Sequence, residues 1–309
     1  MKQTNLYEQA KSWMYRNARP LELARWQFHF EGGSALAVTN ALAAYQNKDG
    51  GFGHALESDS WNPNSSPINT FHAIELLEEI KFYEKSHPMI IGILNYLDSD
   101  VDFDGKVWSN VLLSNNEYPH APWWHHESVS TSHHSYNPTA GLVGFSLSYA
   151  DPNSKLYTKC MSIANEAVEE ILKVDQIDMH ALVCYIKLLD HCKRAEIKTS
   201  FDQMKLERKI SQLVNQAITK DISLWAIQYV CKPSQFFNSP KSLFYAENKV
   251  VADYECEFIQ NTVNSDGVWD VTWSWEAYPE EWALSKNWWK AHIAVNNMCY
   301  LRNFGSLQL

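Results

Sequence analysis

The feature that most constrains the fold is a short motif that occurs three times, each time after an apolar stretch with helical spacing. In each copy an aromatic residue follows an Asp-Gly pair, three or four residues after the aspartate. The copies are Asp49-Gly50 with Phe52, Asp104-Gly105 with Trp108, and Asp266-Gly267 with Trp269. The aspartates are 55 and 162 residues apart, and 162 is three times 54. A fixed period of this size indicates stacked helical hairpins, and rings of such hairpins often enclose a ligand-binding cavity.

The spacing of apolar residues predicts helices along most of the chain. The predicted segments are 6–17, 21–31, 35–46, 67–80, 88–97, 138–149, 155–173, 177–193, 203–219, 224–230, 247–262 and 286–303. Strand signals are few. The length of 309 residues corresponds to five to six hairpins of this period, and no linker or low-complexity segment divides the chain. We therefore expect an all-α protein in which residues 1–309 form a single domain.

Composition narrows the range of partners and compartments. A net charge of −10 argues against a nucleic-acid partner. The apolar runs are far shorter than the roughly 20 residues that span a bilayer, so no membrane span is expected. The first residues lack the apolar core of an export signal, and the six cysteines form no Cys-x-x-Cys pair. These features predict a cytoplasmic protein with reduced thiols.

The first copy of the motif carries a family resemblance. Residues 46–53, Gln-Asn-Lys-Asp-Gly-Gly-Phe-Gly, and the helix start at 66–73 resemble the repeat of the terpenoid cyclase and protein prenyltransferase superfamily. Gln260 with residues 266–269 resembles a looser copy. The whole chain also resembles an uncharacterised bacterial branch described as prenyltransferase-like. The resemblance implies an α/α toroid, with inner and outer rings of helices around an aromatic-lined cavity, but a fold does not fix a function.

The signatures of the known chemistries of that superfamily are missing. The sequence contains no Asp-Asp pair, so it lacks both Asp-x-Asp-Asp and Asp-Asp-x-x-Asp. The single Asp-x-Cys, at residues 190–192, lies outside any recognisable copy of the zinc-binding motif. We therefore predict no metal site, and the sequence does not identify a cofactor.

The long segment at 107–136 is a candidate for a functional loop. It contains His120, Trp123, Trp124 and His125. Histidine acts as an acid or base near neutral pH, and we expect His120 to take this role. We expect Trp123, Trp124 and His125 to bind substrate, with the tryptophans covering an apolar or sugar ligand. The alternative is a loop whose rings plug one end of the toroid. The His133-His134 pair is interpreted as part of a solvated loop.

A second cluster combines aromatic and acidic residues near the last helix. We expect its rings to bind substrate and one carboxyl group to act as an acid or base. Its members are Trp269, Trp273, Trp275 and Glu276. Glu57, after the first copy of the motif, is a second candidate for the acid–base role. The alternative is a structural aromatic core where the ring closes.

Three further patterns indicate metal sites only weakly. Residues 98–105 imitate the start of a calcium loop, but Val111 stands where a bidentate glutamate is required. His180 and Cys184 have zinc-ligand spacing on an apolar helix, where core packing is the more common role. His292 and Cys299 share one stripe of the last helix, and packing is again favoured.

Three functions remain open at this stage. The first is an isoprenoid-handling enzyme of the cyclase or prenyltransferase type, acting on a small apolar substrate with His120 and Glu276 or Glu57 as acid and base. The second is a carbohydrate-active toroid enzyme, which needs stacking rings and two carboxylates. The third is a non-catalytic binding or scaffold protein.

Overall fold

The computed structural model describes residues 3–127 and 136–307 of the chain. Over these residues the protein is all-α, with isolated bridges and no strands, as the apolar spacing predicts. The α-helices are α1 (Gln3–Asn17), α2 (Pro20–Phe30), α3 (Ala35–Ala43), α4 (Pro67–Glu79), α5 (Pro88–Asp98), α6 (Thr139–Tyr149), α7 (Lys155–Ile171), α8 (Met179–Arg194), α9 (Gln203–Ala217), α10 (Tyr245–Asn261) and α11 (Pro279–Asn303). None of these helices is long and apolar enough to cross a membrane.

The chain divides into two compact units. Unit 1 comprises Met1–Leu42 and Ile218–Leu309, and unit 2 comprises Ala43–Ala217. Each unit has its own core and is described by itself. The single domain and the toroid of five to six hairpins stay predictions.

In unit 1, four helices pack around one apolar core. The contributing helices are α1, α2, α10 and α11. Trp269, from the third copy of the motif, is buried in this core, and its indole donates to the Ile259 carbonyl at 2.8 Å. All six cysteines of the chain lie within the described residues, where they are buried and free of disulfides.

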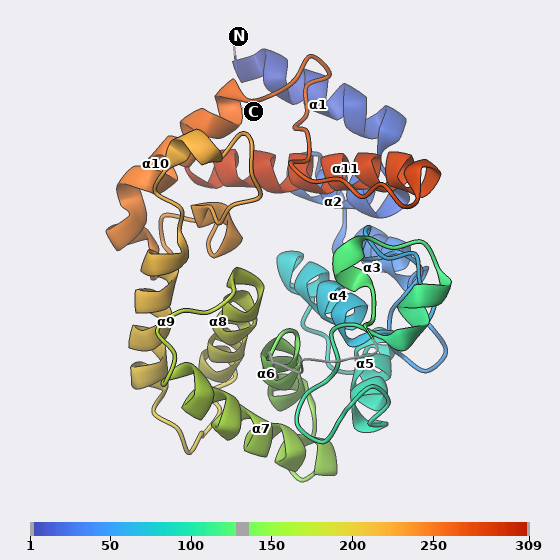
Figure 1. The fold of residues 1–309 in the computed structure, drawn as a ribbon, viewed down its shortest axis with the longest axis vertical. Coiled ribbons are helices and arrows are strands. Elements are labelled where there is room, and N and C mark those ends of the chain that lie inside the picture. Colours follow the sequence, from blue (N-terminus) through green and yellow to red (C-terminus); the bar gives the residue numbers. More distant parts are fainter. Residues whose placement is uncertain (1–2, 128–135, 308–309) are drawn as a thin grey trace. The chain divides into compact units, whose positions relative to one another are not determined.

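In unit 2, helix α6 is the central element. It is apolar on every side and packs against α7, α8 and α4 (Figure 1). Ion pairs also join α4 to α8. Glu78 of α4 lies 2.9 Å from the His191 ring and 2.7 Å from the Lys187 ammonium group of α8. Ser148 of α6 bonds the other nitrogen of His191 at 2.9 Å. Burial opposes ionisation of Glu78, but these partners hold the pKa of its carboxyl well below the ordinary value.

The first and third copies of the motif form the same backbone turn. Asn47 N–H donates to the Gly51 carbonyl at 2.8 Å, and Gly50 N–H donates back to Asn47 at 3.0 Å. The equivalent bonds in the third copy run from Asn264 to Val268, 2.8 Å, and from Gly267 to Asn264, 3.1 Å. The repeat in the sequence is therefore a repeat of local structure.

The aromatic residue of the motif is a core anchor. Phe52 and Trp108 are fully buried. Their backbone N–H groups donate to threonine hydroxyls on the helices that follow, Phe52 to Thr70 at 3.2 Å and Trp108 to Thr139 at 2.9 Å. The first two copies thus dock onto their next helix in the same way.

Two predicted helices differ from the observed ones. The segment at 224–230 is not an α-helix; only the 3₁₀ turn Ile222–Leu224 forms there, and the buried Trp225 indole donates back to the Thr219 carbonyl at 2.9 Å. The last helix begins at Pro279 instead of residue 286. Proline suits the first turn of a helix, and the acidic Glu280 and Glu281 that follow favour its positive end.

We expect Gly50→Ala to destabilise unit 2 far more than Gly105→Ala. Both glycines have positive φ, +93° and +98°, which costs an alanine about 1 to 2 kcal/mol. A Cβ at Gly50 would also lie 2.0 Å from the Gly92 carbonyl oxygen, whereas one at Gly105 would meet nothing within 4 Å. Urea denaturation should show a further loss of at least about 2 kcal/mol for Gly50→Ala. Equal losses would contradict the close approach of the turn to α5.

Candidate functional site

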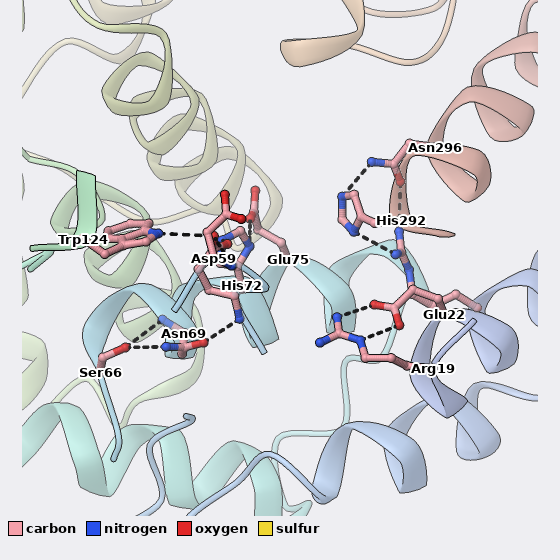
Figure 2. Close-up of polar contacts among 12 residues, drawn as sticks. Arg19, Glu22, Asp59, Ser66, Asn69, His72, Glu75, Trp124, His292 and Asn296 are labelled. Carbon is pink, nitrogen blue, oxygen red and sulfur yellow. Dashed lines mark hydrogen bonds and ion pairs between the residues drawn. The ribbon is translucent and has the colours of Figure 1, made fainter. Parts of the chain in front are cut away.

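The candidate site is centred on the carboxylate of Glu57, in the segment between the first turn and α4. The residue is 4% exposed. Its Oε2 lies 3.0 Å from Nε2 of His72, and its Oε1 accepts from the Trp124 indole and from the backbone N–H of Asp59, both at 3.3 Å. Figure 2 shows His72, Asp59 and Trp124 gathered at this point. Helix α4, the Glu57 segment and the loop that carries Trp124 meet on one carboxylate.

The start of α4 fixes the backbone of Glu57. Ser66 is the N-cap of this helix, and its hydroxyl accepts from the side chain of Asn69 at 2.8 Å. The side-chain oxygen Oδ1 of Asn69 in turn accepts from the backbone N–H of Glu57 at 2.7 Å. A helix cap therefore holds Glu57 in register with His72, which lies one turn further along α4.

Two consecutive residues shortly before Glu57 have a strained backbone. His54 and Ala55 have φ values of 57° and 58°. Residues other than glycine rarely adopt this left-handed conformation, which costs about 1 to 2 kcal/mol each. Such strain persists where the surroundings impose it, and it clusters at functional sites.

The geometry makes Glu57 and His72 an ion pair. Burial favours the neutral carboxylic acid, but the hydrogen bond and charge of His72, together with the Asp59 and Trp124 donors, hold the pKa of Glu57 below its ordinary value. Burial likewise opposes charging of His72, yet Glu57 and Glu75 outweigh it and raise the pKa of His72 to about 10. Glu57 is therefore a carboxylate at neutral pH, which suits a base or a positioning group and not a proton donor.

Both ring nitrogens of His72 are engaged. Nε2 faces Glu57, and Nδ1 lies 3.4 Å from Oε2 of Glu75, one turn further along α4. The His72 and Glu75 side chains are 31% and 29% exposed. Of the two carboxylates that contact His72, Glu75 is therefore the one within reach of a ligand.

The predicted histidine–tryptophan loop docks onto the Glu57 segment. Ala121 N–H donates to the Asp59 carbonyl at 2.8 Å, and Trp61 N–H donates to Pro119 at 2.9 Å. Within unit 2 the structure thus brings together Glu57, His120, Trp124 and His125, which the sequence analysis proposed separately. His120 is buried, His125 is exposed, and Trp123 is 46% exposed.

The other predicted site residues belong to unit 1. Trp269 and Trp275 are buried, which favours the alternative of a structural aromatic core for these two. Trp273 is half-buried and meets the rings of Tyr229 and Trp289 edge-on, both at 5.3 Å. Glu276 is exposed. The site roles of these four residues stay predictions.

His72 and Glu75 were missed in the sequence. Their spacing of three residues places them on one face of a helix, and this is the signal that could have found them. The polar face that carries His72 and Glu75 indicates a site only when the tertiary structure shows that Glu57 lies against it.

The aspartates of the calcium-like stretch contact other protein groups. In the calcium-like stretch, Asp100 pairs with Lys159, Asp102 accepts from the Tyr96 hydroxyl, and Asp104 accepts from two backbone N–H groups of its own turn. No group of three or more His, Cys, Asp or Glu side chains is arranged to hold a metal within residues 3–127 and 136–307.

In each remaining histidine–cysteine pair, the two side chains have different surroundings. His180 is exposed, whereas Cys184 is buried with its thiol 3.6 Å from Asn137. Cys299 lies in the core of unit 1, and His292 contacts Arg25 at 3.0 Å. His133 and His134 lie outside the described residues.

The ion pair predicts a pH-dependent contribution to stability. Because the pKa of His72 is raised to about 10 in the folded protein, its stabilisation is complete below the ordinary value of 6.5 and is lost as the pH rises through 10. Replacing His72 by Gln should cost about 3 kcal/mol near pH 6.5, since it leaves a buried carboxylate unpaired. The difference between the wild type and His72→Gln, measured by urea denaturation, should shrink steadily towards pH 10.

The double variant Glu57→Gln/His72→Gln is the matched control. It removes the unpaired charge and should recover part of the lost stability. A difference that stays constant from pH 6.5 to pH 10 would contradict a charged His72.

Comparisons of the whole chain with protein-family models, with curated proteins and with solved structures found no match. The functional assignment therefore depends on the geometry of the site.

Proposed function

We propose that the Glu57 cluster is an acid–base site for a hydroxyl-rich small molecule, and that a carbohydrate is the class that fits it best. The observation that carries the proposal is a buried ionised carboxylate joined, through the His72 imidazolium, to the accessible carboxylate of Glu75. Enzymes that cleave glycosidic bonds place carboxyl groups beside the scissile bond, and Glu75 is the accessible carboxylate of this cluster.

The environments of these carboxyl groups assign different roles to them. Glu57 is 4% exposed and uses both oxygens within the protein, so it orients and charges His72. Glu75 uses Oε2 for His72 and is more exposed, so it is the group for contact with substrate.

Aromatic rings stand beside these charges. Trp124 donates its indole N–H to Glu57, and Trp123, next to it, is about half exposed. A half-exposed indole presents an apolar face on which a sugar ring can stack, while its neighbours supply hydrogen bonds to hydroxyl groups. This combination of charge and ring is the one that the carbohydrate hypothesis requires.

The polarity of the cluster disfavours an apolar substrate at this place. An isoprenoid would remove the exposed part of the Glu75 carboxylate from water without offering hydrogen bonds in return, and such a loss costs several kcal/mol. The second candidate, isoprenoid handling, is supported instead by unit 1, where the half-buried rings of Trp273 and Trp289 pack edge to face. The repeated Asp-Gly turns are also consistent with it.

We expect Glu75→Gln to abolish most turnover while preserving the fold. A panel of aryl glycosides and oligosaccharides identifies a working substrate, and kcat/KM should then fall about 100-fold or more, the usual contribution of an acid–base group. Glu84→Gln, an exposed glutamate of the same unit, is the matched control and should leave kcat/KM unchanged. Equal activities of the two variants, or no binding and no turnover across the panel, would overturn the carbohydrate proposal.

Native mass spectrometry distinguishes the second candidate. The purified protein is compared before and after denaturation, and a released isoprenoid with the mass of a C10 to C30 chain would favour lipid handling. A released sugar would favour the carbohydrate proposal.

A further inference from the structure

We propose that His125 is the solvent-facing base of the site, acting through Nε2, and that His120 is the positioning residue that keeps this nitrogen unprotonated. The role of His125 in turnover rests on the proposed acid–base function, whereas its chemistry can be tested without any substrate. The assignment moves the acid–base role that the sequence analysis gave to His120 onto His125.

The argument starts from the buried ring. Nδ1 of His120 lies 2.6 Å from the carbonyl oxygen of Tyr118. A carbonyl oxygen can only accept a hydrogen bond, so Nδ1 of His120 carries the proton. A neutral imidazole has one N–H group, and Nε2 of His120 is consequently an acceptor.

The second ring follows from the first. Nε2 of His120 lies 3.0 Å from Nδ1 of His125. Because His120 accepts at this contact, His125 must donate, and its proton is on Nδ1. The lone pair of neutral His125 is then on Nε2, and no described residue bonds this nitrogen. A backbone carbonyl thus fixes the tautomers of two rings in series.

The surroundings hold this arrangement in place. The two ring planes are within 14° of each other and their centroids are 5.2 Å apart, as expected for two imidazoles joined edge to edge by an in-plane hydrogen bond. His120 is 6% exposed, whereas His125 is exposed. The backbone between them is fixed by the bond from Ala121 to Asp59 and by the turn in which His125 N–H donates to Pro122 at 3.2 Å. A base oriented by a second group in this way is the arrangement of catalytic dyads and triads.

The chemical step is simple to balance. A ligand hydroxyl gives its proton to Nε2 of His125, and the oxygen keeps the electron pair of the broken O–H bond. The imidazolium that forms keeps its Nδ1 proton directed at Nε2 of His120, which is itself polarised by the Tyr118 carbonyl. The buried ring therefore accepts from Nδ1 of His125 both before and after the proton transfer.

Diethyl pyrocarbonate tests the free lone pair directly. Nε2 attacks a carbonyl carbon of the reagent, the bond from that carbon to ethyl carbonate breaks, and the ring then loses its Nδ1 proton to solvent. We expect peptide mapping at a fixed neutral pH to show His125 among the fastest-modified histidines of the chain. His120→Asn should slow this reaction severalfold, because a free imidazole ring places its proton on Nε2 for much of the time.

Two controls separate the outcomes. His126→Gln, beside the pair, should leave the rate at His125 unchanged. Glu75→Gln should abolish turnover without changing the labelling of His125, so that failure of the acid–base proposal and failure of the tautomer assignment are distinguishable.

Nitrogen-15 NMR of the wild type gives a readout that needs no variant. It should show Nδ1–H tautomers for both His120 and His125. An Nε2–H tautomer on His125, or a labelling rate that His120→Asn leaves unchanged, would overturn the proposal.

Discussion

The carboxylate of Glu57 is the interaction on which the arrangement of the candidate site depends. It is buried, and it accepts hydrogen bonds from α4, from its own segment and from the loop at 118–126. Burial alone would neutralise it, but His72 and the two neutral donors hold it ionised. Removing one partner of a buried ion pair typically costs 3 to 5 kcal/mol. The Glu57 carboxylate therefore links the three segments that contact it.

The turn that precedes Glu57 supplies the rigidity that this charge requires. Gln46 bonds the carbonyls of Gly50 and of Met89 on α5, at 2.9 and 3.1 Å, and Asp49 accepts from the Ser65 hydroxyl at 2.7 Å. The chain therefore enters the strained residues 54 and 55 from a fixed point and leaves them into the capped start of α4. The turn has the same hydrogen bonds in the first and third copies, so its role is structural. The acidic segment that contains Glu57 follows only the first copy.

Much of the fold follows from local patterns, and the site follows only in part. Helical spacing and the Asp-Gly turns predict the α-helices of both units, because these depend on neighbours in the sequence. Glu57, His120 and Trp124 were recognisable as candidates from their residue types. The sequence did not show that these residues lie close together, because their proximity depends on a backbone bridge between segments about 60 residues apart. The protonation of His72 likewise depends on a carboxylate that only the tertiary structure brings to it.

The central claim is that Glu57 and His72 are both charged at neutral pH, and NMR titration of the two side chains tests it most directly. The carboxyl carbon of Glu57 should stay in its ionised form as the pH falls through 4.5, the ordinary value, and the His72 ring should stay protonated until the pH approaches 10. A neutral His72 ring at pH 7, or a Glu57 carboxyl that takes up its proton above pH 4.5, would contradict the account.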